Sequence, residues 1–227
     1  MTKPTSRVHS RRAQAKAQTH ERIIASAAHL VRRAGLTATS VPRVMRGAGL
    51  TVGGFYAHFR SKRALDAAVI ARAMREVRES WFAGLEHSAG SAFLARAVKR
   101  YLSLRHRDDV AHGCVLPSTI SELTRADRGT RLAMAEAVEQ VATVFERHAA
   151  EAMSQLPAER ALGMTPRERA LSTLALLVGG LTTARALRGH PLSDELLAAC
   201  IKLALPDPAT RKSRSGPRSG PVPRREP

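Results

Sequence analysis

The sequence predicts an all-α protein. Apolar residues recur at spacings of three and four along most of the 227-residue chain, as they do on one face of a helix. Alanine, leucine and arginine, which suit helices, dominate the composition, whereas aromatic residues make up only 4%. No segment shows a convincing strand pattern, and no internal repeat is present. These observations favour a helical fold over a β-sandwich.

The first helix is expected to begin at Thr19. Gly35 stands where a residue in the left-handed conformation would end it. Its apolar face would be formed by Ile23, Ile24, Ala27, Leu30 and Val31.

Two short helices follow, separated by a glycine-containing turn. Thr39 or Ser40 can cap the first, which tolerates Pro42 because this residue lies in its first turn. Gly49 ends that helix, and Thr51 opens the next with a hydroxyl that can cap it. Two short helices across such a turn are typical of a helix-turn-helix unit.

A fourth helix is expected from a cap at Ser61 to about Leu85. Its buried stripe would consist of Leu65, Val69, Ala73, Val77 and Trp81.

The rest of the chain predicts a helical body. Leu132 and Phe145 belong to the apolar face of its longest helix, and Thr165 with Glu168 forms a capping box before another. Ser193 is expected to open the last helix. The expected helices span residues 91–106, 118–124, 128–155, 166–187 and 193–205.

Positive charge is concentrated at the two ends of the chain. The formal net charge is +18, and residues 1–63 contain 13 Lys and Arg against one acid, which gives +12. Residues 206–227 contain six basic residues and two acids, which gives +4. The middle of the chain, residues 64–205, contains 18 basic residues and 16 acids, which gives +2. A cationic end joined to a nearly neutral body indicates that the end binds a polyanion such as nucleic acid.

Charge and periodicity together divide the chain into four parts. Residues 1–17 are expected to be a disordered basic arm and 18–64 a helix-turn-helix DNA-binding domain. Residues 65–205 would form a helical ligand-binding and dimerisation domain. Residues 206–227, rich in Pro, Arg and Ser, would be a disordered basic tail. The two basic ends either add nonspecific DNA affinity or only solubilise the protein.

The sequence predicts a soluble cytoplasmic protein. Cys114 and Cys200 are too few for a disulfide framework and suit a reducing compartment. The arginine pair at 11–12 has no apolar run behind it, so no secretory signal is expected. The most apolar stretch, residues 170–184, is too short for a membrane span and is interrupted by Ser, Thr and Gly.

Residues 49–62 combine groups that a DNA backbone would need and a protein core would not. A cap at Thr51 would leave backbone N–H groups free to face an anion, and the two glycines that follow expose the backbone. Tyr56 and His58 have polar tips, and Lys62 adds a positive charge one turn later. The alternative readings are a core aromatic for Tyr56 and a helix-packing histidine for His58.

Several motifs follow one another at fixed spacing in this region. They are Gly35-Leu36, Thr39-Ser40-Val41, Ala48-Gly49-Leu50-Thr51, Gly54-Phe55-Tyr56-Ala57-His58-Phe59-Arg60-Ser61-Lys62, and Leu65. Together they resemble the tetracycline-repressor (TetR) family of bacterial transcription regulators. Pro42 departs from the pattern, which has an acidic or polar residue there. Beyond residue 65 the number and order of helices suit the family.

The resemblance implies an all-α homodimer that binds a near-palindromic operator and releases it when a small-molecule effector enters the body. Activation instead of repression is equally compatible with it. The very apolar 170–187 helix could bury a second face against a twin, which gives a two-fold four-helix interface. Two reading heads would then enter major grooves about 34–36 Å apart. The expected interface residues are Leu174, Leu177, Val178, Leu181, Leu197 and Ile201.

The resemblance also assigns DNA-binding residues. Thr51, Val52 and Gly53 would lie at the exposed start of the recognition helix, where base edges and phosphates are reached. Thr39 and Ser40 would meet the backbone from the second helix. The phosphate-gripping positions would be Tyr56, His58 and Lys62, and charge alone adds Arg43 and Arg46.

Candidate effector contacts are the larger side chains expected inside the body. An apolar stripe at helical spacing usually forms plain core, so they are candidates only. Cys114 could have a lowered thiol pKa because Arg105, His106, Arg107 and His112 are close in sequence, and could then react with electrophiles. The alternative is a buried structural cysteine. The full set is Met74, Trp81, Tyr101, His106, Cys114, Met134 and Phe145.

Two other classes of function compete with a ligand-responsive regulator. An enzyme would need convergent acid, base or nucleophile groups, yet the His and acidic residues lack metal-ligand spacing and no Gly-rich phosphate loop is present. We therefore expect no catalytic activity, metal or cofactor. A sequence-neutral architectural DNA-binding protein is the second alternative, and a redox or electrophile sensor acting through Cys114 is a variant of the regulator.

Overall fold

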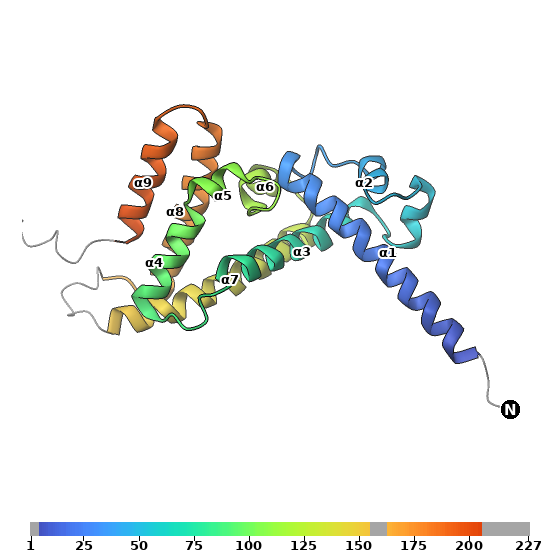
Figure 1. The fold of residues 1–227 in the computed structure, drawn as a ribbon, viewed down its shortest axis with the longest axis horizontal. Coiled ribbons are helices and arrows are strands. Elements are labelled where there is room, and N and C mark those ends of the chain that lie inside the picture. The colour runs from blue at the N-terminus through green and yellow to red at the C-terminus, as the bar shows by residue number, and fades with distance from the viewer. Residues whose placement is uncertain (1–4, 155–162, 206–227) are drawn as a thin grey trace, which may run out of the picture.

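The computed structural model describes residues 5–154 and 163–205, and within these ranges the chain is helical throughout, with no strand. The predicted all-α class is confirmed. The basic tail 206–227 lies outside the described residues, as do residues 1–4 of the arm. The helices, shown in Figure 1, are α1 (Thr5–Ala34), α2 (Val41–Gly47), the 3-10 helix η1 (Val52–Ala57), α3 (Lys62–Phe82), α4 (Gly90–Tyr101), α5 (Leu104–Asp108), α6 (Leu116–Leu123), α7 (Arg128–Ser154), α8 (Pro166–Ala186) and α9 (Leu192–Ala204).

The N-terminal unit consists of α1, α2, η1 and the start of α3. Gly35 ends α1 with φ of 80°, as predicted, because glycine has no Cβ to oppose the left-handed conformation. The hydroxyl of Ser61 caps α3 by accepting a hydrogen bond from the Ala64 N–H. The predicted stripe of α3, from Leu65 to Trp81, is buried. The side of α1 that carries Ile23 is also buried, so local patterning places this unit correctly.

α1 begins at Thr5 and not at Thr19. The expectation of an irregular arm over residues 1–17 was therefore wrong from Thr5 onward. Residues 10–18 are exposed and lack an apolar periodicity. They contain three alanines and several Arg, Lys and Gln residues, all of which favour helix, and they extend a helix that is already nucleated downstream.

The third element is a six-residue 3-10 helix, not an α-helix capped by a side chain. Thr51 stands at its N-cap in extended conformation, but its side chain makes no capping hydrogen bond, so this expectation was wrong. Gly49, with φ of 68°, provides the turn that precedes it.

The body is built around α7. Helices α3, α4 and α8 pack against α7, and α9 folds back along α8 (Figure 1). The predicted capping box at the start of α8 is confirmed, because the Thr165 N–H donates to Glu168 and the Glu168 N–H donates to the Thr165 hydroxyl.

Three predictions for the body were wrong in detail. The helix expected over 91–106 is broken after Tyr101, because the Ser103 hydroxyl accepts a hydrogen bond from the His106 N–H and starts α5. Leu132 is 48% exposed instead of buried. Ser193 does not open α9; it is fully buried, and its hydroxyl donates to the carbonyl of Ala184 at 2.7 Å.

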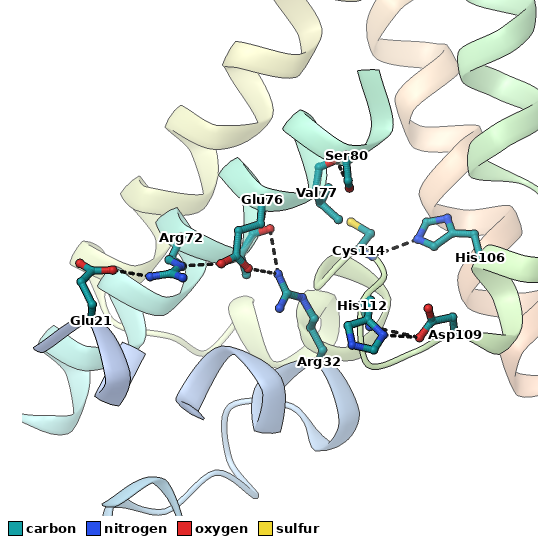
Figure 2. Close-up of polar contacts among 11 residues, drawn as sticks. Glu21, Arg32, Arg72, Glu76, Val77, Ser80, His106, Asp109, His112 and Cys114 are labelled. Carbon is teal, nitrogen blue, oxygen red and sulfur yellow. Dashed lines mark hydrogen bonds and ion pairs between the residues drawn. The ribbon is translucent and has the colours of Figure 1, made fainter. Parts of the chain in front are cut away.

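Two polar links join the N-terminal unit to the body. Arg32 on α1 is buried and donates to Glu76 of α3 at 2.7 Å (Figure 2). On α6, the Glu122 carboxylate accepts the backbone N–H groups of Leu36 at 2.6 Å and Thr37 at 3.1 Å. Both links lie close to the turn between α1 and α2, so they fix the direction in which the helix-turn-helix unit points.

Two further searches covered the described ranges. None of their helices is long and apolar enough to cross a membrane. Within the same ranges, no three His, Cys, Asp or Glu side chains are grouped closely enough to hold a metal ion.

Candidate nucleic-acid interface

Phe55 fixes the position of the segment that follows the turn. Its side chain is fully buried, stacks on Phe59 with ring centroids 5.7 Å apart, and belongs to the same core as Met45 of α2. Burial of one large aromatic ring stabilises a short 3-10 helix that its own hydrogen bonds would hold only weakly.

This anchor leaves the other side of η1 exposed. Val52 is 47% and Tyr56 is 74% exposed, and Thr51 and Gly53 are exposed as well. A Cβ atom on Gly53 would meet no atom within 4 Å, and its φ is not positive. The protein's own packing therefore gives no reason for glycine at this position, whereas the close approach of a partner would.

His58 differs from the simple phosphate contact that was predicted. It is half-buried, its Nδ1 atom has no hydrogen-bond partner, and its ring centroid lies 6.1 Å from that of His20 on α1. Burial lowers the pKa of His58, and the charges of His20 and Lys16 lower it further. Because the Nδ1 atom itself is buried, this nitrogen is closed to an incoming anion in this conformation.

Two of the predicted contacts are occupied inside the protein. Thr39 is buried, and its hydroxyl donates to the carbonyl of Gly35 at 2.7 Å, so it closes the end of α1 and cannot reach DNA in this conformation. Lys62 donates to the carbonyl of Leu36 at 3.3 Å and pairs with Asp66. It can reach a phosphate only by exchanging one of these partners.

The remaining predicted residues of α2 are exposed. Ser40 is the N-cap of α2, but its hydroxyl makes no capping bond. Arg43 donates to the carbonyl of Ala38 at 2.8 Å, and Arg46 is exposed in the last turn. Arg43 and Arg46 thus place positive charge on α2, the helix that packs against η1.

Sequence reasoning missed two residues that shape this region. His20 stacks on Phe59 with ring centroids 4.5 Å apart, and Arg22 donates to the carbonyl of Ala48 at 2.6 Å, next to Gly49. His20 lies four residues before the apolar face of α1, where an aromatic ring was a usable signal. The role of Arg22 had no local signal, since its partner is 26 residues away.

A groove of about 720 Å³ lies where the helix-turn-helix unit meets the body. Side chains of both signs line it, among them Lys62, Asp66, Glu122 and Arg125. Burial raises the pKa of Glu122, but hydrogen bonds from Thr37 and Leu36 outweigh it and bring the pKa below its ordinary value. None of the seven candidate effector residues lines this groove.

Most of the candidate effector residues come together elsewhere, inside the body. The rings of Trp81 and Tyr101 have centroids 4.6 Å apart, and those of Trp81 and Phe145 are 5.4 Å apart. The Nδ1 atom of His106 faces the carbonyl of Tyr101 at 2.7 Å, and its Nε2 accepts the N–H of Cys114 at 3.0 Å (Figure 2). Met74 and Met134 are buried in the same core.

The expectation of a lowered Cys114 pKa was wrong. Cys114 is buried, and burial raises the pKa of its thiol. Two of the four groups expected to lower it are paired elsewhere. Arg107 pairs with Asp108 and Asp194, and His112 pairs with Asp109 (Figure 2). The thiol therefore has the surroundings of a structural cysteine.

The six predicted interface residues divide into two groups. Leu177, Leu181 and Leu197 are buried inside the chain itself and cannot contact a partner. The other three, Leu174, Val178 and Ile201, are half-buried.

Residues 23–69 match the family model described as "Bacterial regulatory proteins, tetR family". These residues include the buried part of α1, α2, η1 and the first turns of α3. No curated protein sequence matches the chain.

Solved structures of bacterial proteins share the fold over most of the chain. A TetR transcriptional regulator from Chloroflexus aurantiacus has a TM-score of 0.69 at 22% identity, covering 83% of this chain and 95% of that one. The reduced form of E. coli NemR has a TM-score of 0.66 at 19% identity, and the match covers 81% of this chain and 95% of that one. Bacillus subtilis FadR in complex with stearoyl-CoA has a TM-score of 0.63 at 17% identity, and the match covers 82% of this chain and 97% of that one. Residues 23–69 thus match the tetR family of bacterial regulatory proteins, and the chain as a whole shares its fold with solved structures that include TetR transcriptional regulators.

Proposed function

We propose that the protein is a homodimeric repressor that binds a near-palindromic operator and is released by a small-molecule effector. The observation that carries the DNA-binding part is the exposed side of η1. Thr51, Val52, Gly53 and Tyr56 all face outward there because Phe55 anchors the opposite side. Backbone and hydroxyl groups at Thr51 and Tyr56 position the segment on phosphates, and Val52 can contact a thymine methyl group.

Sequencing the duplexes retained by the purified protein from a random pool tests this proposal. A single palindrome, preferred over random DNA by about a thousandfold or more, supports an operator-binding regulator. Retention without sequence preference would instead identify an architectural DNA-binding protein.

Gly53→Leu provides the residue-level test. A side chain at residue 53 meets open space in the free protein, so folding and thermal unfolding are expected to be unchanged. Operator binding should be abolished, because the added side chain stands between η1 and the groove floor. Ala135→Leu, at an exposed position of α7, is the matched control and should bind normally. Normal binding by Gly53→Leu would contradict the placement of η1 in the groove.

The effector is expected to enter the body beside Tyr101. Nη1 of Arg185 is buried without a hydrogen-bond partner, and the Tyr101 hydroxyl, which lies beside the Cys114 thiol, is within electrostatic range of it. A buried donor of this kind costs about 1–3 kcal/mol, which a ligand oxygen would recover. Trp81 and Phe145 provide an apolar wall next to them. We therefore expect an effector with an apolar part and an acceptor such as a carboxylate or carbonyl.

Compounds that differ only in this acceptor test the effector assignment. In gel shifts with the selected operator, carboxylates or ketones should release the DNA, and hydrocarbons of equal size should not. Tyr101→Phe should leave the thermal unfolding midpoint nearly unchanged, since the hydroxyl has only the weakly accepting Cys114 thiol beside it, and should weaken release about 10-fold. Equal release by the hydrocarbons, or unchanged release of Tyr101→Phe, would refute this assignment.

A further inference from the structure

The N-terminal part of α1 extends beyond the helix-turn-helix unit (Figure 1). Residues 10–18 are all exposed, and their charged residues are Arg11, Arg12 and Lys16, without an acid. At 1.5 Å per residue, the ten steps from Ser10 to His20 extend about 15 Å, which equals the rise of about four base pairs.

The chemistry of one face of α1 changes where the helix leaves the unit. Ile23, Ala27 and Val31 face the core and are buried. Lys16 and Arg12 lie two and three helical turns before Ile23, so at 3.6 residues per turn they continue the same face toward the N-terminus. This face of α1 is therefore apolar where the protein core covers it and cationic where the helix extends beyond the core.

His20 marks the point of change and connects this face to η1. Its ring stacks on Phe59, directly after the exposed segment, and lies beside His58. Lys16 is near enough to His58 for its charge to act on that side chain. Arg12, Lys16, His20 and His58 consequently form one line, which we call the α1 stripe.

We propose that the α1 stripe binds the DNA backbone outside the palindromic core of the operator. The inference rests on the proposed function, because it requires η1 to dock on duplex DNA. Any duplex that lies against the exposed side of η1 continues past the end of this unit, where the same face of α1 is turned toward it. Closely spaced cations without acids match a row of phosphates, and contacts of this kind add affinity without reading sequence.

The test compares Arg12→Ala/Lys16→Ala with wild type on two duplexes. One ends at the palindromic core, and the other continues for about ten base pairs on each side. Alanine preserves helicity, which circular dichroism verifies. Arg96→Ala/Lys99→Ala on α4 removes the same charge from exposed body positions and is the control.

Wild type should bind the extended duplex more tightly than the short one. The double variant should have the same affinity for both duplexes, equal to the affinity of wild type for the short one. Each lost phosphate contact lowers the slope of log K against log salt by about 0.9, so two contacts per protomer predict a decrease of about 1.8 per half-site. The α4 control should behave as wild type.

An unchanged salt slope of the double variant on the extended duplex would overturn the α1 stripe, while selection of the palindrome by wild type would leave the proposed function intact. If wild type selects no palindrome at all, the proposed function itself fails. Equal losses on the short and extended duplexes would show that these cations act inside the core and would also refute the proposal.

Discussion

At the scale of single residues, Tyr56 and Lys62 are two different kinds of proposed phosphate contact. Tyr56 is exposed and makes only an edge contact with the ring of Phe55, whereas Lys62 is tied to Leu36 and Asp66. Tyr56→Phe should therefore weaken binding to all sequences about 10- to 150-fold, the value of a hydrogen bond to a charged group, with no change in protein stability. Lys62→Ala should lower both affinity and stability.

Fluorescence anisotropy with operator and random DNA, together with urea unfolding, measures both effects. A loss by Tyr56→Phe on the operator alone would show that the hydroxyl reads a base and does not bind a phosphate.

His58 predicts a pH dependence of operator binding. Its pKa is below 6.5 in the free protein, because of burial and of the charges of His20 and Lys16, and a phosphate next to it would raise this pKa. The complex then binds more protons than the free protein, so affinity should increase as pH falls through the pKa of the complex, and should level off below the pKa of the free protein. Anisotropy titrations between about pH 5.5 and 8, where most domains are stable, check this.

His58→Gln is the control for this titration and should remove most of the slope. A slope that persists in His58→Gln would assign the proton uptake to another group.

At the scale of secondary-structure elements, Glu122 links α6 to the end of α1. Its carboxylate accepts two backbone N–H groups, and a Cβ on Gly35 would come within 3 Å of it. Glu122→Ala should leave these N–H groups unsatisfied, at a cost of about 1–3 kcal/mol, and speed hydrogen exchange at Leu36 and Thr37 about 5- to 150-fold. Glu136→Ala, on the exposed side of α7, is the control and should change neither the unfolding free energy nor these exchange rates.

The link also has a defined pH window. Since the pKa of Glu122 is lowered from 4.5, its contribution to stability is complete above that pH and is lost as pH falls through the folded-state pKa. The difference in unfolding free energy between wild type and Glu122→Ala should therefore vanish in acid.

Arg32 and Arg72 both pair with Glu76 but differ in burial. Arg32 is buried and also donates toward the carbonyl of Ala73. Arg72 is more exposed, and it forms a second ion pair with Glu21, whose side chain is largely in solvent (Figure 2). Arg32→Met should cost about 1–3 kcal/mol of unfolding free energy and Arg72→Met at most about 1 kcal/mol. Urea unfolding at equal protein concentration measures both, and equal losses would contradict the difference in burial.

Elements that depend on local chemistry were predictable from sequence, and elements that depend on distant contacts were not. The Thr165 capping box and the Gly35 terminus need only neighbouring residues. By contrast, Thr39 was expected to face DNA but turns inward to Gly35. The predicted DNA contacts were equally uneven. The exposed side of η1 followed from its own residues, but the stacking of His20 on Phe59, just after η1, required tertiary structure.

At the scale of the whole molecule, α8 and α9 present the surface that a second copy would cover. Leu203 is 69% exposed on α9 and Leu171 is 42% exposed on α8. Between the half-buried residues of α8, Gly179 has open space at its Cβ position, which permits close approach of another helix. Leu171→Glu/Leu203→Glu should convert dimer to monomer in sedimentation velocity and abolish tight operator binding, because one reading head remains.

Leu177→Ala is the contrasting variant. Leu177 is fully buried in its own chain, so this change should lower the unfolding free energy by about 2–5 kcal/mol. A dimer that survives the paired Glu substitutions would place the interface on another face.

Helix α3 belongs to both halves of the molecule. Its first residue, Lys62, adjoins the turn between α1 and α2, and its last turn carries Trp81 into the aromatic core of the body. With 21 residues it measures about 31 Å. A tilt of about 5° about the Trp81 end would displace the Lys62 end by about 2.7 Å at that length. An adjustment of a fraction of an ångström around the tryptophan is thus enlarged at the far end to the dimension of a hydrogen bond.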